Sequence, residues 1–188
     1  NHSIIQDIEK ARAEIAKLVG ADKEEIIFTS GATESNNLAI KGMISKIKRG
    51  KNHFITLNTE HKCVLEALRK VELEGAKVSI LKVKKDGLID IKMLRDIITE
   101  KTLMISIMIA NNETGVLQPI DKIGKLCKKK GIFFHTDAAQ AVGKIKINVR
   151  KMNIDLMSIS SHKFYGPKGV GAIYIRKKPR IRLNTLID

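Results

Sequence analysis

The sequence predicts an α/β fold with three layers, in which helices cover both faces of a mostly parallel sheet. Short apolar segments of strand length alternate with longer segments whose apolar residues recur at helical spacing. The segment 103–109 is apolar almost throughout, as expected for a strand that is buried on both faces. Alternation of strands and helices is typical of a sheet whose strands run mostly parallel.

The first half of the chain begins with a helix and then alternates. Apolar residues between Ile4 and Leu18 recur at helical spacing, and Gly20 is expected to end this helix. The elements expected next are a strand at 26–29, a helix at 34–45, a strand at 54–57, a helix at 63–74 and a strand at 78–83.

The second half continues the pattern. The elements expected there are a helix at 91–98, a strand at 103–109, a helix at 120–130, and strands at 132–136, 156–160 and 170–175. No internal repeat and no linker rich in Gly, Pro or Ser divides the chain. We therefore predict that residues 1–188 belong to one domain.

Composition limits the classes of function. Hydrophobic residues make up 43% of the 188 residues, which excludes a disordered chain despite a formal net charge of +15. The basic residues are scattered over every segment, and five Phe, two Tyr and no Trp leave few rings for base stacking. We attribute the charge to a lysine-rich solvated surface, with nucleic-acid or acidic partners as alternatives. Two cysteines are too few for a disulfide framework and favour a reducing compartment.

Polar clusters follow five of the predicted strands. Ligands in sheets of this kind bind outside the carboxyl ends of the strands, so the five clusters predict one composite pocket. The clusters occupy residues 30–33, 60–62, 111–113, 137–140 and 160–163.

The first cluster, Ser30-Gly31-Ala32-Thr33, lies between a strand and a helix. Free backbone N–H groups at the start of that helix suit a phosphate, and Thr33 adds a hydroxyl donor. A simple helix cap is the alternative, since Ser, Gly and Thr all occur in caps. The chain has no Walker sequence and no GxGxxG motif, so a nucleotide is not indicated.

Asp137 follows an apolar strand that should bury it. A buried carboxylate is unfavourable unless a cation pairs with it, and a protonated pyridine nitrogen would be such a cation. The alternative is a residue that caps the following turn. Gln140 lies three residues further on and would face the same pocket if a helical turn begins there.

Lys163 follows another predicted strand, 156–160. A lysine at the end of a buried strand is poorly solvated, which favours the neutral, nucleophilic amine that forms a Schiff base with an aldehyde. A surface lysine in a lysine-rich chain is the alternative. Together, a phosphate-binding turn, a carboxylate for a ring nitrogen and a Schiff-base lysine are what pyridoxal 5'-phosphate requires.

These motifs resemble those of the cysteine desulfurases of the iron–sulfur cluster assembly type, within the class V pyridoxal-phosphate aminotransferase family. The resemblance covers nearly the whole chain. Its segments are 28–42 (FTSGATESNNLAIKG), 59–65 (TEHKCVL), 111–113 (NNE), 135–144 (HTDAAQAVGK), 155–163 (DLMSISSHK) and 165–175 (YGPKGVGAIYI).

The resemblance implies a role for each matching residue. Lys163 would bind the cofactor aldehyde, Asp137 would pair with the ring nitrogen, and Gln140 would hydrogen-bond the phenolic oxygen of the ring. His61 would stack on the ring and take part in proton transfer, as a second catalytic residue beside Lys163. The remaining cofactor contacts implied are Ala32, Thr33, Ser160 and His162 at the phosphate, and Asn112 near the substrate carboxylate and the ring oxygen.

The resemblance also implies an activity, in which sulfur is removed from L-cysteine to leave L-alanine and an enzyme-bound persulfide for iron–sulfur cluster assembly and tRNA thiolation. A homodimer, an iron–sulfur scaffold protein and accessory proteins would be the partners, in mitochondria if the source is eukaryotic and in the cytoplasm if it is bacterial. The fold would be the large domain of pyridoxal-phosphate fold type I, with an N-terminal segment and a C-terminal small domain outside these residues. Neither Cys63 nor Cys127 matches the persulfide cysteine. A selenocysteine lyase or another class V aminotransferase is the alternative.

Overall fold

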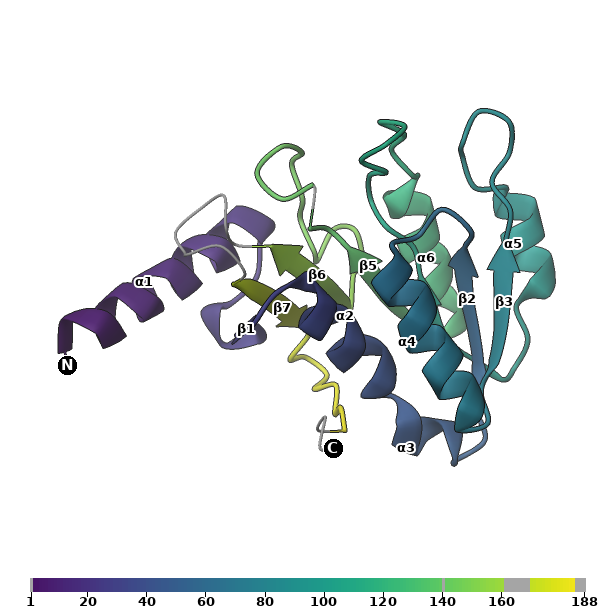
Figure 1. Ribbon diagram of the computed structural model, residues 1–188, viewed down its shortest axis with the longest axis horizontal. Coiled ribbons are helices and arrows are strands. Elements are labelled where there is room, and N and C mark those ends of the chain that lie inside the picture. The colour runs from purple at the N-terminus through teal and green to yellow at the C-terminus, as the bar shows by residue number, and fades with distance from the viewer. Residues whose placement is uncertain (1, 140, 161–169, 185–188) are drawn as a thin grey trace.

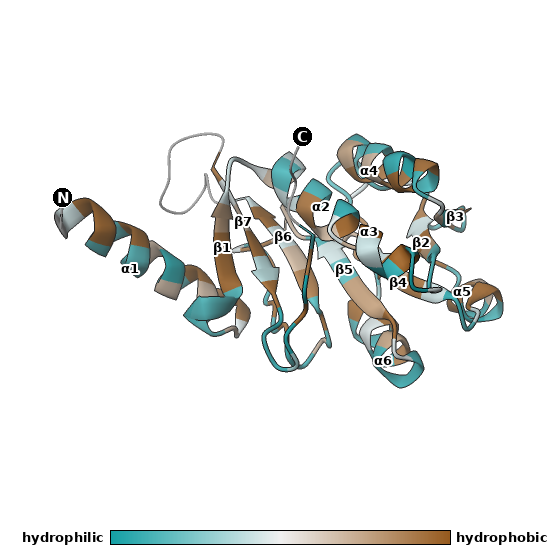
Figure 2. Ribbon diagram, turned by 90° about the horizontal axis from the view of Figure 1, so that it is seen from below, coloured by the Kyte–Doolittle hydropathy of each residue, from teal (hydrophilic) through white to brown (hydrophobic). Residues whose placement is uncertain are grey.

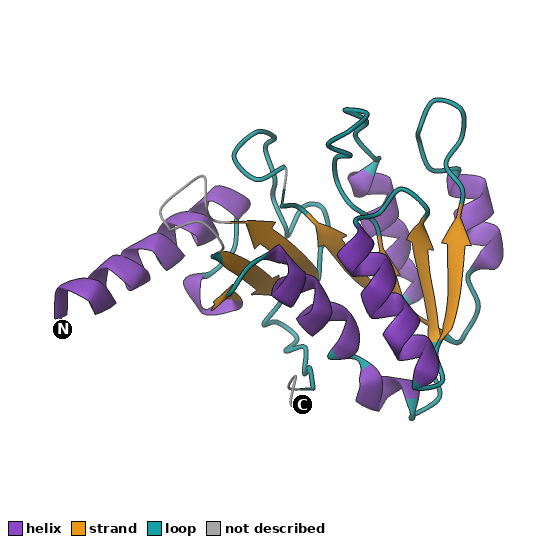
Figure 3. Cartoon of the chain, in the orientation of Figure 1, coloured by secondary structure: helices purple, strands orange, loops and turns teal. Residues whose placement is uncertain are grey.

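A computed structural model describes residues 2–139, 141–160 and 170–184, and it has the three layers that the sequence predicts (Figure 1). Helices and strands alternate along most of the chain (Figure 3). The helices are α1 (His2–Val19), α2 (Ala32–Lys41), α3 (Ile44–Ile47), α4 (Lys62–Leu73), α5 (Ile91–Ile97) and α6 (Ile120–Lys130), with a short 3-10 turn at Lys23–Glu25. The strands are β1 (Ile26–Thr29), β2 (His53–Leu57), β3 (Lys77–Leu81), β4 (Thr102–Ser106), β5 (Phe133–Asp137), β6 (Leu156–Ser160) and β7 (Gly171–Ile175).

The strands form one sheet in the order β1-β7-β6-β5-β4-β2-β3. The pairs from β6 to β3 are all parallel, which confirms the mostly parallel sheet. β7 is antiparallel to both of its neighbours, β1 and β6. Because two reversals cancel, β1 runs in the same direction as β6, and the sheet contains one strand of opposite direction.

Each face of the sheet carries its own hydrophobic core (Figure 2). On one face, Ile15 of α1, Leu94 of α5 and Ile123 of α6 belong to a single buried cluster. On the other face, helices α2, α3 and α4 bury a second cluster. Neighbouring strand residues alternate between the two, as Met104 and Ile105 of β4 show. This period of two follows from the pleat of a strand and explains the almost continuous apolar strands.

Most predicted bounds differ from the observed ones by one or two residues, and two elements end three or more residues earlier than the sequence predicts. The helix expected at 34–45 begins earlier, at Ala32, and stops at Gly42, after which α3 begins as a separate helix. The strand expected at 103–109 ends as a strand at Ser106, although the backbone N–H of Ile107 still donates to the carbonyl of His135. The prediction extended the strand because burial, and therefore apolar sequence, continues beyond the regular ladder.

Within the described ranges, none of the helices combines the length and the apolar character needed to cross a membrane. The same residues contain no group of three or more His, Cys, Asp or Glu side chains that could hold a metal ion.

Candidate active site

The predicted pocket lies at the edge of the sheet where β1, β2, β4, β5 and β6 end. All of these strands run in the same direction, so their carboxyl ends lie at a common edge, and β7, which runs in the opposite direction, begins there. The register places Gly171 of β7 between Thr29 of β1 and Ser160 of β6. The turn at 30–33 and the end of β6 are therefore neighbours, although about 130 residues separate them in the chain.

The turn before α2 has the form predicted for an anion site. Gly31 is the residue before the helix, Ala32 and Thr33 are its first two residues, and the Thr33 side chain is exposed. The Thr29 hydroxyl contacts the carbonyl of Gly31 at 3.0 Å and the Ser35 hydroxyl at 2.8 Å. These contacts stabilise the turn. The first N–H groups of a helix lack partners within the helix and attract an anion.

Gly171 allows the start of β7 to pack directly on this turn. A Cβ atom at position 171 would lie 2.6 Å from the carbonyl carbon of Gly31 and 2.8 Å from its Cα. Real Cβ atoms do not approach backbone so closely, so only glycine is compatible with this contact. The close contact fixes the turn before α2 against the start of β7.

Asp137, the last residue of β5, is only 3% exposed. Its Oδ1 accepts a hydrogen bond from the backbone N–H of Ala139 at 3.0 Å, and its Oδ2 accepts one from Nδ2 of Asn36 at 3.0 Å. It forms no ion pair with any Lys, Arg or His in the part of the chain that the structure describes. The hydrogen bond from Ala139 shows that Asp137 also caps the following turn, which was the alternative role that the sequence suggested. A protonated ring nitrogen would be a cation partner for this carboxylate, so the residue fits pyridoxal phosphate.

The turn that carries His61 is anchored through its neighbour, Glu60. Both carboxyl oxygens of Glu60 lie 3.0 Å from the backbone N of Met108, which follows β4. Burial raises the pKa of Glu60 well above its usual value, the N–H of Met108 opposes this, and the charge of Asp137 adds to it. His61 itself is half-buried and caps α4, since its carbonyl accepts from the N–H of Val64 at 3.0 Å. The position of His61 at the strand edge is therefore fixed by the buried carboxyl group of its neighbour, Glu60.

Asn112 lies in the loop after β4, where its side chain is exposed. Its neighbour Asn111 orders this loop, because Asn111 Nδ2 donates to the carbonyl of Thr59 and its Oδ1 accepts from the N–H groups of Glu113 and Thr114. The loop with Asn112 is thereby tied to the turn with His61. The two polar clusters that follow β2 and β4 do come together, as predicted.

His135 lies in the middle of the sheet, two residues before Asp137, and is fully buried. Its Nδ1 lies 2.7 Å from the Ser106 hydroxyl of β4, and its Nε2 lies 2.9 Å from the Ser158 hydroxyl of β6. Burial lowers the pKa of His135 to about 4, although the charge of Asp137 acts in the opposite direction. The imidazole is therefore neutral near pH 7 and does not supply the positive charge that Asp137 lacks.

We expect His135 to make the protein less stable as the pH falls from about 6.5 to about 4. In this window the unfolded chain binds a proton at residue 135 and the folded chain does not, so protonation favours unfolding. The largest loss is about 3 kcal/mol. Urea unfolding of the intact protein at several pH values measures it, with His135→Gln as the reference. Because other groups titrate in both proteins, the difference between the two curves isolates His135, and parallel curves would contradict the prediction.

Three of the predicted site residues, Gln140, His162 and Lys163, lie outside the described residues. Sequence reasoning missed Asn36 and His135 as parts of the site, and it included Glu60 only as a member of the polar cluster 60–62, without a role. Asn36 lies on the buried face of a helix, where a polar residue is the signal that was available. Glu60 lies directly before His61, and His135 is the polar residue of an otherwise apolar strand.

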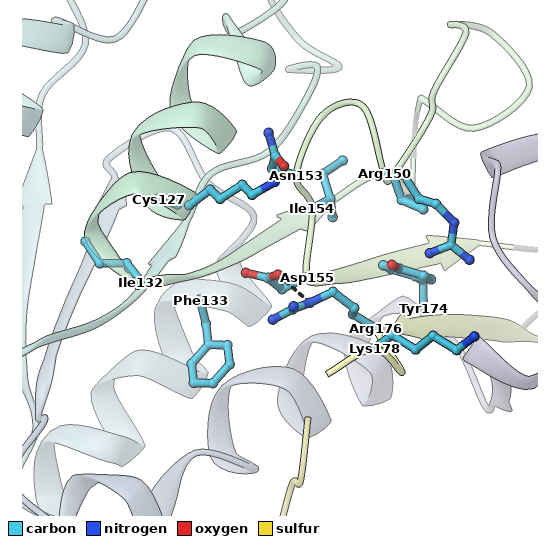
Figure 4. A pocket seen from close by; sticks show the side chains of 13 residues that line it. Cys127, Ile132, Phe133, Arg150, Asn153, Ile154, Asp155, Tyr174, Arg176 and Lys178 are labelled. Carbon is cyan, nitrogen blue, oxygen red and sulfur yellow. Dashed lines mark ion pairs between the residues drawn. The ribbon is translucent and has the colours of Figure 1, made fainter. Parts of the chain in front are cut away.

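A cavity of about 400 Å³ lies away from these residues (Figure 4). It is formed by the end of α6, the start of β5, the residues before β6 and the end of β7 with the residues that follow it. Asp155 and Arg176 form an ion pair of 2.8 Å in its wall. This is the opposite edge of the sheet from Asp137. The arginine is already paired, and none of the predicted site residues lines this cavity.

Comparisons with known proteins agree with this architecture. Residues 1–186 match the family described as "Aminotransferase class-V". Cysteine desulfurase IscS of Rickettsia massiliae (strain Mtu5) is 58% identical over 181 residues, which are 96% of this chain and 44% of that protein. The chain thus spans less than half the length of this curated relative.

Two solved structures share the fold. The structure titled "SspA in complex with cysteine" has a TM-score of 0.92 and 46% sequence identity, covering 99% of this chain and 54% of that one. DndA from Streptomyces lividans has a TM-score of 0.87 and 38% identity, covering 97% of this chain and 52% of that one. The predicted fold is confirmed, and the chain belongs to the class V aminotransferase family.

Proposed function

We propose that the intact protein is a pyridoxal-phosphate-dependent cysteine desulfurase, which converts L-cysteine to L-alanine and leaves the sulfur as an enzyme persulfide. The observation that carries the proposal is Asp137, a buried carboxylate with two N–H donors and no cation partner among the described residues. The similarity to proteins named cysteine desulfurase supports the choice of reaction.

The residues of this chain would hold the cofactor at its two ends. When bound, pyridoxal phosphate supplies an aldehyde that joins amines and a ring that accepts electrons from the substrate. Asp137 would hold the ring nitrogen in its protonated, electron-accepting form. Ala32 and Thr33 would bind the phosphate through the start of α2, together with Ser160 and His162.

The remaining residues would act on the ring and the substrate. We assign Lys163 to the covalent hold on the aldehyde, and Gln140 to a hydrogen bond with the phenolic oxygen. His61 follows the anchored Glu60 at the strand edge. We assign it to stacking on the ring and to moving a proton. Asn112 would approach the substrate carboxylate from the loop after β4.

The cysteines of this chain do not suit the persulfide role. Cys127 is fully buried in α6, and burial raises the pKa of its thiol further above the usual value. Cys63 is half-buried at the start of α4 and contacts Asn36 Nδ2 at 3.2 Å. We therefore place the persulfide-forming cysteine outside these residues, and propose that the 188 residues alone do not turn over cysteine.

The partners and the location are part of the same proposal. A homodimer, a scaffold protein that accepts sulfur for iron–sulfur clusters and accessory proteins would complete the system, in mitochondria or in the bacterial cytoplasm according to the source. A selenocysteine lyase, or another class V aminotransferase, would use the same cofactor residues. The substrate assay below distinguishes these activities.

The intact protein, supplied with pyridoxal phosphate, is expected to be yellow and to release alanine from L-cysteine. Borohydride should bleach the colour and leave a pyridoxyl group on Lys163, which mass spectrometry of the peptides locates. Colour with alanine release from selenocysteine alone would favour the lyase. A colourless protein that binds nucleic acid with a steep salt dependence would refute the cofactor site altogether.

A further inference from the structure

Asn36 of α2 lies directly against Asp137 and is fully buried. Its Nδ2 group donates to Asp137 Oδ2 at 3.0 Å and to Cys63 Sγ at 3.2 Å. An amide nitrogen carries two hydrogens, so both are in use. The amide oxygen Oδ1 is buried and has no hydrogen-bond partner among the residues that the structure describes.

The orientation of this amide places its donor against Asp137, which suits a carboxylate acceptor. Turning the amide over would place Oδ1 against an oxygen of Asp137, where two acceptors repel each other if the carboxyl group is ionised. The observed orientation leaves Oδ1 without a partner, which is unfavourable for a buried oxygen. A donor to a charged carboxylate makes a stronger bond than a donor to a neutral acceptor, and this bond offsets the loss. The arrangement therefore supplies a charge-stabilising donor to a carboxylate at position 137.

We propose that Asn36 is a positioning residue that keeps the Asp137 carboxylate ionised, so that the proton shared with the cofactor stays on the ring nitrogen. The inference rests on the proposed function, which supplies that nitrogen. Asp137 has no other side-chain donor among the described residues, and its second contact is the backbone N–H of Ala139.

The consequence of removing the amide follows from the burial of the pair. Without Asn36, the carboxylate retains one N–H donor in a site that excludes water. In such a site, a neutral carboxylic acid beside an unprotonated ring nitrogen becomes more stable than the ion pair, because charges are poorly solvated there. Without Asn36, Asp137 would hold the proton of the ring nitrogen less well, and a bound cofactor would accept electrons less readily.

The test uses the intact protein loaded with pyridoxal phosphate that carries ¹⁵N in the ring. The ¹⁵N chemical shift distinguishes a protonated from an unprotonated ring nitrogen, and titration of the cofactor-free protein gives the dissociation constant. Asn36→Leu keeps the size of the side chain but removes the donor. We expect its ring nitrogen to be mostly unprotonated, and its affinity for the cofactor to fall about tenfold. Asn36→Ala, which adds no bulk to the helix, should shift the signal in the same direction.

Ser35→Ala is the matched control. Ser35 is the preceding residue of α2 and is equally buried, but its hydroxyl contacts Thr29 and the carbonyl of Ala172 instead of Asp137. This variant should keep the ring nitrogen protonated even if it lowers stability. A protonated nitrogen and unchanged affinity in the Asn36 variants would overturn the inference, and so would an equal shift in Ser35→Ala. Failure of the unaltered protein to bind the cofactor would instead overturn the proposed function.

Discussion

Asp137→Asn in the intact protein is expected to lower alanine formation by at least about a hundredfold. The neutral amide cannot pair with a protonated ring nitrogen, so the bound cofactor loses its proton and accepts electrons poorly. The amide nitrogen would also replace one of the two acceptor oxygens, so its hydrogens would face either Nδ2 of Asn36 or the backbone N–H of Ala139, each of which is itself a donor. Rate measurements with L-cysteine, together with the ¹⁵N shift of the ring, would record both consequences.

Asp155→Asn provides the control for this substitution. Asp155 is a partly buried aspartate that lies directly before β6, at the opposite edge of the sheet from Asp137. It pairs with Arg176 at 2.8 Å and accepts a hydrogen bond from the N–H of Phe134. Its replacement should reduce stability and leave the ring nitrogen protonated. If Asp137→Asn retained a protonated ring and near-normal rates, the assignment of Asp137 to the cofactor would be wrong.

Gly171→Ala is expected to separate β7 from the turn before α2. The new Cβ atom would lie 2.6 Å from a backbone atom of Gly31, and backbone cannot turn aside as the end of a side chain can. Overpacking of this kind destabilises a protein by about 1–3 kcal/mol. Because the displaced turn carries the N–H groups assigned to the phosphate, affinity for pyridoxal phosphate should fall about tenfold or more.

Gly131→Ala is the control that separates a loss of stability from a loss of cofactor affinity. Gly131 ends α6 with a φ of +68°, and a Cβ atom there meets no atom within 4 Å, so alanine is strained only by its backbone conformation. We expect a comparable loss in thermal stability with no change in cofactor affinity. Equal losses of affinity in both variants would show that the contact at Gly171 has no special relation to the cofactor.

Helices and strands whose apolar residues recur regularly, and which end at a glycine or a turn, could be predicted from sequence. The expected strands at 26–29 and 156–160 and the expected helix at 120–130 have the observed bounds, since burial on one or both faces determines their apolar pattern. The direction of β7 could not be predicted in this way. A strand of either direction shows the same residues to both cores, and its direction is decided by where its neighbours lie.

The candidate site was only partly predictable, because some of its contacts join residues that are far apart in the sequence. Asp137 was found because a carboxylate directly after a buried strand is unusual, and the structure buries it. Its contact with Asn36 joins residues 101 positions apart, so no local pattern announces it. The anchoring of Glu60 on Met108, 48 positions away, was equally invisible. Such contacts depend on which helix the sheet places above which strand.

The single reversed strand has a consequence for biosynthesis. In the described sheet, β1 forms its ladder only with β7, so β1 cannot pair until β7 has been synthesised. A ribosome must therefore release residues 171–175 before the segment around Gly31 acquires its neighbour. Until then the nascent chain exposes an unpaired edge at β6, and the turn that we propose to hold the cofactor phosphate lacks the strand that packs on it.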